Sequence, residues 1–372
     1  MKIEPRKVDD PYEIILNNMR EYPSDIPIVD GKVSEAFREY IKILFSPKEA
    51  IIAQHLTIRP QSVNAISKKI GKNKEATKGI LEDMTKKGII QDVGGYSYFL
   101  AMAHLLNMGF KYSRTLKRLG KKGAELYQQF FIEEKFYKRY ESSDKGTSLT
   151  RIVPINLSLD HQTTISNAEE IHDIIEKCMG PIVITDCPCR KRTETLGIRE
   201  CKDEFPIEET CFQVGLFGQY FLRRGEGKEL SRQEAHDLVD KLAKKGLVFT
   251  TENIKSPIHQ VICSCCACCC ALLRGITRFE DKNENCTARS NYMSIVEQDL
   301  CKGCGLCVKR CPFQAVTIEN GKSIVKNEKC YGCGLCAVTC PTGAIKLHRL
   351  ERSHIFNDVA ELMKKIYHEN RS

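Results

Sequence analysis

Two cysteine runs near the C-terminus constrain the chain more than any other feature. Residues 301–312 read CKGCGLCVKRCP, and residues 330–341 read CYGCGLCAVTCP. Both have the spacing C-x2-C-x2-C-x3-C-P, and the second run follows the first by 29 residues. A 4Fe–4S cubane needs four thiolates at tetrahedral corners, and a tight glycine-containing loop supplies three of them. The fourth follows a short helical turn that the proline ends, so each run predicts cluster ligands.

The two runs resemble bacterial two-cluster ferredoxins over about residues 292–350. The resemblance implies that the fourth cysteine of each run serves the cluster of the other run. One 4Fe–4S cluster would take Cys301, Cys304, Cys307 and Cys340, and the other would take Cys330, Cys333, Cys336 and Cys311. The apolar residues after each run would form hairpin strands over the clusters. Zinc sites instead use C-x2-C pairs at two separated places. With every iron capped by sulfur, such a domain relays single electrons at low potential.

A second cysteine system lies in the middle of the chain, where ten cysteines fall between residues 187 and 270. They are Cys187, Cys189, Cys201, Cys211, Cys263, Cys265, Cys266, Cys268, Cys269 and Cys270. Thiolates this close repel one another unless a metal neutralises them. We therefore expect at least one further Fe–S cluster here, with some side chains of an irregular 263–270 loop pointing at it. A zinc site using four of the same cysteines is the alternative, and a thiol/disulfide centre would need only a pair.

Three residues near this system have less specific roles. Arg190 follows Cys189 and would balance the negative charge of a cluster or bind an anionic partner, although an ordinary surface salt bridge is the alternative. Cys178 lies on the apolar face of a predicted helix and is expected in the core. The sequence leaves the role of Cys286 open. The nine histidines are scattered and show no metal-ligand spacing.

The first 150 residues contain no cysteine and predict three helices, at 46–56, 61–71 and 73–88. Ser46 is a candidate N-cap, and two short strands are expected around Gly94 and Gly95. This order resembles a winged helix-turn-helix over about residues 40–100. The resemblance implies that 73–88 enters a DNA groove, with lysines near phosphates. A scaffold or protein contact surface is the alternative, because the helix offers few base-reading side chains.

The remaining pattern predicts an α+β multidomain protein with a cysteine-rich α/β middle. A strand at RIVPINL, a helix over 166–178 opened by Ser166 and Glu169, and a strand at 181–185 lead to the first middle cysteines. Further helices are expected at 231–246 and 354–368. We expect a winged-helix-like and helical domain over 1–150, the cysteine-rich domain over 151–290, the ferredoxin domain over 291–350 and a C-terminal helix over 351–372.

Taken together, CPCR, the CSCCACCC segment and the ferredoxin tail resemble a group of poorly characterised 4Fe–4S binding proteins from anaerobes. The resemblance implies cluster binding and electron transfer but supplies no substrate. The start of the sequence has no apolar core of a signal peptide, and the longest apolar run has 13 residues, too short for a membrane helix. We therefore expect a cytoplasmic protein without membrane insertion, where clustered cysteines bind metal more often than they form disulfides.

The net charge of +9 is concentrated in two zones, with 17 Lys/Arg against 9 Asp/Glu over 61–150 and 8 against 2 over 301–350. These zones are compatible with acidic partners, such as a ferredoxin, a flavoprotein, an oxidoreductase subunit or a nucleic acid, but a solvated lysine-rich face explains them as well. The sequence predicts an electron carrier or redox subunit that relays electrons through two ferredoxin-type clusters and a further cluster in the middle. Two alternatives remain: a redox-sensing transcription regulator that binds DNA, and an oxidoreductase with catalysis at the central cluster.

Overall fold

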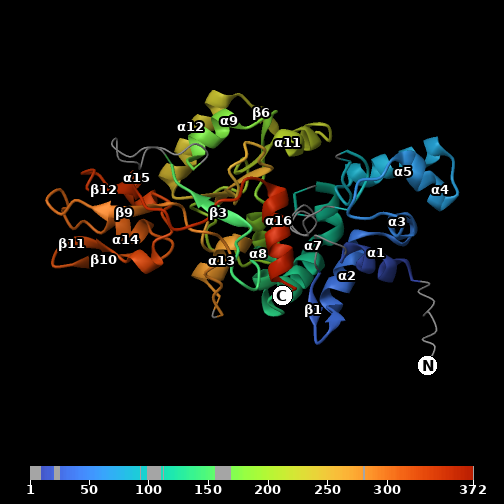
Figure 1. The fold of residues 1–372 in the computed structure, drawn as a ribbon, viewed down its shortest axis with the longest axis horizontal. Helices are drawn as coiled ribbons and strands as arrows, with labels where there is room; N and C mark the ends of the chain where they lie inside the picture. The colour runs from blue at the N-terminus through green and yellow to red at the C-terminus, as the bar shows by residue number, and fades with distance from the viewer. Residues whose placement is uncertain are drawn as a thin grey trace. The chain divides into compact units, whose positions relative to one another are not determined.

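The computed structural model describes residues 10–20, 26–92, 94–98, 110–111, 113–155, 169–279 and 281–371 (Figure 1). The chain divides into two compact units. The first comprises Met1–Phe136 and Lys191–Ile198, and the second comprises Tyr137–Arg190 and Arg199–Ser372. Within the described ranges, no helix is long and apolar enough to cross a membrane.

The first unit is mainly helical. Its elements are α1 (Pro11–Met19), β1 (Ile28–Val29), β2 (Lys32–Val33), α2 (Glu35–Leu44), α3 (Pro47–Ala53), α4 (Val63–Ile70), α5 (Lys74–Lys86), α7 (Ser113–Tyr127) and the π-helical segment η1 (Gln128–Glu133). Among the described residues around Gly94, the expected strands appear only as isolated bridges, Gln61 with Tyr96 and Gln91 with Ser97. The winged-helix arrangement therefore stays a prediction.

Helices α3 and α5 show how the local sequence determines the helix start and the buried helix face in the first unit. Ser46 caps α3, as predicted, and it forms a full capping box with Glu49. Helix α5 buries Thr77, Leu81, Met84 and Thr85, whereas Ala76 is exposed. Helical spacing predicts a buried face of Ala76, Ile80, Leu81 and Met84, so the buried face is shifted from the expected one. Lys87, one of the lysines proposed to approach phosphates, instead forms salt bridges with Glu49 at 2.8 Å and with Asp83.

The second unit is built on a six-stranded sheet with the order β3-β7-β8-β5-β4-β6. The strands are β3 (Thr150–Val153), β4 (Ile182–Thr185), β5 (Cys211–Val214), β6 (Lys228–Leu230), β7 (Val248–Glu252) and β8 (Val261–Cys265). Every pairing in this sheet is antiparallel. Strands β3 and β4, which flank the predicted helix, are separated by three other strands. Residues 263–265 of the segment 263–270, which was expected to be irregular, belong to strand β8, whereas 267–269 form a turn.

The helices of the second unit are α8 (Phe136–Glu141, whose first residue belongs to the first unit), α9 (Ile171–Lys177), α10 (Pro188–Thr195, continuing into the first unit), α11 (Gly215–Leu222), α12 (Arg232–Lys245), α13 (Ala271–Thr277) and α16 (Val359–Glu369). Helix α12 was expected, and a capping box of Ser231 and Glu234 starts it. Helix α9 begins later than predicted, because Glu170 caps it. Glu169 instead pairs with Arg349 at 2.5 Å, and Ser166 lies outside the described residues.

The C-terminal cysteine runs form a mixed α/β region with two similar halves. It contains β9 (Tyr292–Val296), α14 (Leu306–Arg310), β10 (Val316–Glu319), β11 (Lys322–Val325), the 3-10 turn η3 (Asn327–Lys329), α15 (Leu335–Thr339) and β12 (Ile345–Arg349). Strands β10 and β11 form the expected hairpin, and β12 pairs with β9. Gly303 and Gly332 have positive φ, and a Cβ at either would lie 2.1 Å from a backbone oxygen. Only glycine fits these two turns.

Candidate metal centres

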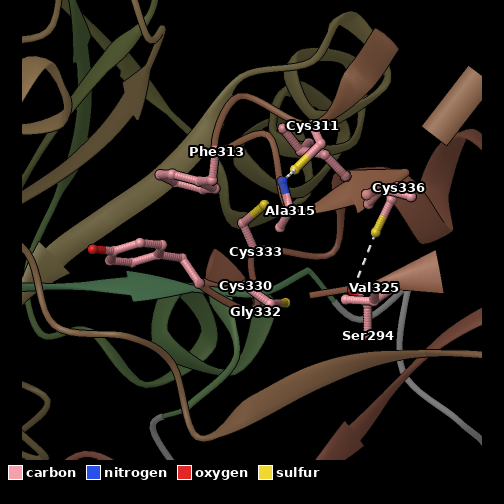
Figure 2. Close-up of a pocket in the computed structure, with 12 residues that line it drawn as sticks. Ser294, Cys311, Phe313, Ala315, Val325, Cys330, Gly332, Cys333 and Cys336 are labelled. Atoms are coloured by element: carbon pink, nitrogen blue, oxygen red, sulfur yellow. Dashed lines mark hydrogen bonds between the residues drawn. The ribbon is translucent and has the colours of Figure 1, made fainter. Parts of the chain in front are cut away.

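Three of the four cysteines of the second run meet Cys311 of the first run around one cavity (Figure 2). The cavity is lined by Cys311, Cys330, Cys333 and Cys336 and by apolar residues that include Phe313, Tyr331 and Leu335. These four cysteines are the set that the ferredoxin resemblance implies for one cluster. A largely apolar cavity with four convergent thiols suits a 4Fe–4S cluster, so the residues present fit that group.

Hydrogen bonds and burial set the state of these thiols. The Ser294 hydroxyl lies 3.1 Å from the Cys336 sulfur, and the Ala315 amide donates to the Cys311 sulfur at 3.3 Å. Burial raises the pKa of Cys336 to about 12 and raises that of Cys311. The protein alone therefore holds these thiols neutral, and a bound metal would be needed to hold them as thiolates.

Hydroxyl and amide groups also contact sulfurs of the other predicted ligand set, which is Cys301, Cys304, Cys307 and Cys340. Ser323 of β11 donates its amide to the Cys301 sulfur at 3.4 Å, and its hydroxyl lies 3.1 Å from the Cys307 sulfur. The Cys340 sulfur lies 3.6 Å from the Thr342 hydroxyl. Cys304 is exposed. The third cysteine of each run therefore has a serine hydroxyl beside its sulfur: Ser323 lies beside Cys307, and Ser294 lies beside Cys336.

Four of the middle cysteines form a compact group, which we name the Cys266 group: Cys201, Cys266, Cys268 and Cys269. Their sulfur atoms all lie within 4.8 Å of one another. Cys201 comes from a loop that follows α10, and the other three come from the turn after β8. Hydrogen bonds with the other three thiols of the group lower the pKa of Cys266, whereas hydrogen bonds with the other three thiols raise the pKa of Cys269. Such mutual dependence is expected where several thiols compete to ionise without a cation.

A second set of middle cysteines forms a connected series, which we name the Cys189 group: Cys187, Cys189, Cys263, Cys265 and Cys270. Side-chain hydrogen bonds join Cys187 to Cys189, Cys189 to Cys270, Cys270 to Cys265 and Cys265 to Cys263. Cys187 and Cys189 open helix α10, whereas Cys263 and Cys265 lie on the same face of β8. Strand alternation sends Ile262 and Ser264 to the opposite face.

Arg190 lies between these two groups and is fully buried. Both of its terminal nitrogens donate to the Ser264 carbonyl at 3.3 Å. Burial opposes its charge, but Cys187, Cys266 and Cys265 outweigh burial and raise the pKa of Arg190. The guanidinium therefore faces thiols of both groups. Its burial is unlike the surface salt bridge that the sequence left open.

The remaining middle cysteines lie outside these groups. Cys211 is buried on β5, directly across from Cys263 of β8, and accepts a hydrogen bond from Gln213 at 3.2 Å. Cys178 is buried in the apolar core under the sheet, as predicted. Cys286 is also buried, and its thiol donates to the Leu272 carbonyl at 2.6 Å. None of the twenty cysteines, all of them within the described residues, forms a disulfide.

One pair of polar residues escaped the sequence reasoning. Helices α9 and α12 pack together and bring the Nδ1 atoms of His172 and His236 to 2.7 Å. His172 also contacts Asp240 at 3.0 Å, and His236 contacts Glu176 at 3.3 Å. The two histidines are 64 residues apart, and only the packing of two helical faces joins them. The sequence predicted both helices but not which of their faces would meet.

Comparison with known proteins bears on the C-terminal region. Residues 294–347 match the family model of a 4Fe-4S dicluster domain. No solved structure matches the chain. The matched range contains all eight cysteines of the two runs. The domain and the cysteine groups support 4Fe–4S clusters and an iron–sulfur electron-transfer role, and the middle cysteines suggest a further centre.

Proposed function

We propose that this protein is an electron relay with two ferredoxin-type clusters and a third iron–sulfur centre held by the Cys189 group. The eight cysteines of the two runs would hold the first two clusters in the crossed arrangement stated above. A 4Fe–4S cluster bound by Cys187, Cys189, Cys265 and Cys270 would supply a further one-electron site. Cys265 ends strand β8, Cys270 precedes α13, and Cys187 and Cys189 lie at the start of α10.

A single apolar cluster carries this proposal. Cys265 and Cys270 belong to it together with Phe313, Tyr331 and Leu335, and Cys311 and Cys333 pack against it. The third centre and one ferredoxin cluster would therefore share the same dry interior. Phe313 and Tyr331 stack with ring centroids 4.5 Å apart within this interior. Close packing without intervening water suits rapid electron exchange between the two centres.

The surface near Cys304 is the proposed site of exchange with a partner. Cys304 is exposed, and so are Leu306, Lys302 and Lys309 in the same short segment. A small apolar area bordered by lysines suits an acidic redox protein, such as a ferredoxin or flavoprotein. Twenty cysteines, none of them in a disulfide, suit a reducing compartment, which favours the cytoplasm of an anaerobe.

Anaerobic iron and sulfide analysis of the wild-type chain and of Cys270→Ser tests the proposal. We expect about twelve sulfides per wild-type chain and about eight in the variant, because each cubane contributes four. Cys178→Ser is the matched control, since Cys178 is an equally buried thiol of the apolar core. About eight sulfides in the wild-type chain would remove the third centre from the account.

A further inference from the structure

The Cys266 group differs in its spacing from the predicted cubane ligands. Its closest sulfur pairs are Cys201 with Cys266 at 3.9 Å and with Cys269 at 3.6 Å, and Cys268 with the same two sulfurs at 3.7 and 3.5 Å. Within the described part of the chain, which holds every cysteine, the two ferredoxin sets form no group as tight as this. The same structure thus distinguishes two kinds of thiol set.

A single ion explains the tight spacing. With metal–sulfur bonds of about 2.3 Å, the edges of a tetrahedron of four thiolates are about 3.8 Å long. The four shortest sulfur distances of the group, 3.5–3.9 Å, lie at that value. A cubane must fit four irons and four sulfides between its ligands, so its ligand sulfurs stand much farther apart.

The two remaining sulfur pairs exclude a planar arrangement. A planar square with the same edges, the arrangement of copper or nickel sites, would have diagonals of about 5 Å or more. The diagonals of this group, Cys201 to Cys268 and Cys266 to Cys269, are each within 4.8 Å. The four sulfurs therefore do not lie in one plane, and their arrangement approaches a tetrahedron. Tetrahedral sites with four sulfur ligands select zinc or iron.

We propose that Cys201, Cys266, Cys268 and Cys269 bind one divalent metal ion, zinc or iron, in a closed tetrahedral site. Four thiolates fill the coordination sphere, so the site has no position for a substrate and is structural. Cys266 and Cys269 are buried in the core cluster that also contains Cys201, with Val338 of α15 packed against it. This site is separate from the third centre of the proposed function and does not depend on it.

The ion would fasten an otherwise irregular segment. In the described segment 199–210, which belongs to the second unit, there is neither helix nor strand. Cys201 is its link to the turn at 266–269. The neighbouring Arg190 donates a hydrogen bond to Cys266 and supplies one positive charge. Four thiolates and one divalent cation carry a net charge of −2, and Arg190 offsets part of it.

The ratio of metal to acid-labile sulfide tests the site in the wild-type protein. Each cubane contributes iron and sulfide in equal numbers, whereas a single ion contributes metal and no sulfide. After gel filtration with a chelator under anaerobic conditions, zinc plus iron should exceed sulfide by about one per chain. An excess of zinc and an excess of iron with a tetrahedral four-sulfur Mössbauer signal both support the proposal. Equal metal and sulfide would overturn it.

A variant separates this proposal from the electron relay. Cys269→Ser should lose the excess metal ion and keep its sulfide, whereas Cys178→Ser should keep both. Loss of about four sulfides in Cys269→Ser would show a cubane at the Cys266 group and refute the single ion while leaving the relay intact. If the variant does not fold, the wild-type ratio still decides the question.

Discussion

The Arg190 guanidinium donates two hydrogen bonds, each of 3.3 Å, to the carbonyl oxygen of Ser264. Ser264 stands between Cys263 and Cys265 on β8, so this contact fixes a buried cation beside both middle cysteine groups. The positive charge has no solvent around it. Its place in the protein is explained if the nearby thiols are thiolates that carry metal.

Replacing Arg190 should therefore weaken the middle centres. Arg190→Met is expected to destabilise the metal-loaded middle by about 3 kcal/mol or more, because it leaves buried negative charge uncompensated. It should also lower the reduction potential of the third centre, since a nearby cation favours the more negative reduced state. Arg190→Lys should have a smaller effect, because it keeps the charge and loses the two-nitrogen contact.

EPR-monitored redox titration and metal analysis check this prediction. Lys241→Gln is the control, since Lys241 is an exposed cation on α12. An Arg190→Met protein with wild-type metal content and potentials would show that the cation does not serve the middle centres.

Two serines should tune the two ferredoxin clusters separately. Ser294→Ala removes the hydroxyl 3.1 Å from Cys336, and Ser323→Ala removes the hydroxyl 3.1 Å from Cys307. A lost hydrogen bond of about 1 kcal/mol corresponds to about 40 mV for one electron, and the potential should fall. Each variant should shift the cluster that its own cysteine ligates.

The two variants serve as controls for each other in the same potentiometric titration. Equal shifts of both clusters in each variant would contradict the assignment of Cys307 and Cys336 to different clusters.

Charge at the exposed segment around Cys304 should govern the partner reaction. Lys302→Glu with Lys309→Glu is expected to slow electron exchange with an acidic ferredoxin about tenfold at low ionic strength, and added salt should narrow the difference. Lys364→Glu on α16 changes an exposed charge elsewhere in the same unit. Stopped-flow absorbance measures the rates. Similar rates in both charge-reversed proteins would place the docking surface elsewhere.

Glu49 should stabilise the first unit through its charge. Burial opposes ionisation, but hydrogen bonds from Arg118, Lys87 and Ser46 outweigh it and lower the pKa of Glu49 to about 2. The folded pKa is below the unfolded value of about 4.5, so the contribution is present at neutral pH and is lost as the pH falls from about 4.5 to 2. The shift corresponds to about 3 kcal/mol.

Hydrogen exchange of peptides from α3 and α5 measures this contribution in the full chain. Glu49→Gln should speed exchange at pH 7, and the difference from wild type should shrink by pH 3. Glu82→Gln, which removes an exposed ion pair of 3.8 Å with Lys78, should have little effect. A pH-independent difference would show that the carboxylate charge is not the source.

The sequence predicted most reliably what local spacing determines. The two cysteine runs, the N-cap at Ser46, the helix that starts near Ser231 and the β10–β11 hairpin each depend on residues a few positions apart. The order of the antiparallel sheet depends on pairings between distant segments, which periodicity does not reveal. The strand at 261–265 was missed because its cysteines obscured the alternation of inward and outward residues.

The same limit explains the middle cysteines. Their density predicted metal, but their division into two groups depends on where Cys201 meets the turn after β8, 65 residues away. Strand β8 places Cys263 and Cys265 on one face, and the turn then places Cys266, Cys268 and Cys269 with Cys201. No pattern within the run itself shows where one group ends and the other begins.

The interaction between the third centre and a ferredoxin cluster tests the account most directly. Cys265 and Cys270 share an apolar cluster with residues packed against Cys311 and Cys333, so the two reduced centres should be near enough for their electron spins to couple. The measurement is the EPR spectrum of the fully reduced wild-type protein and of Cys270→Ser. The account predicts splitting in the wild type beyond that of the two ferredoxin clusters, and the loss of this additional splitting in the variant. A wild-type spectrum that equals the variant spectrum plus one independent signal would contradict the relay.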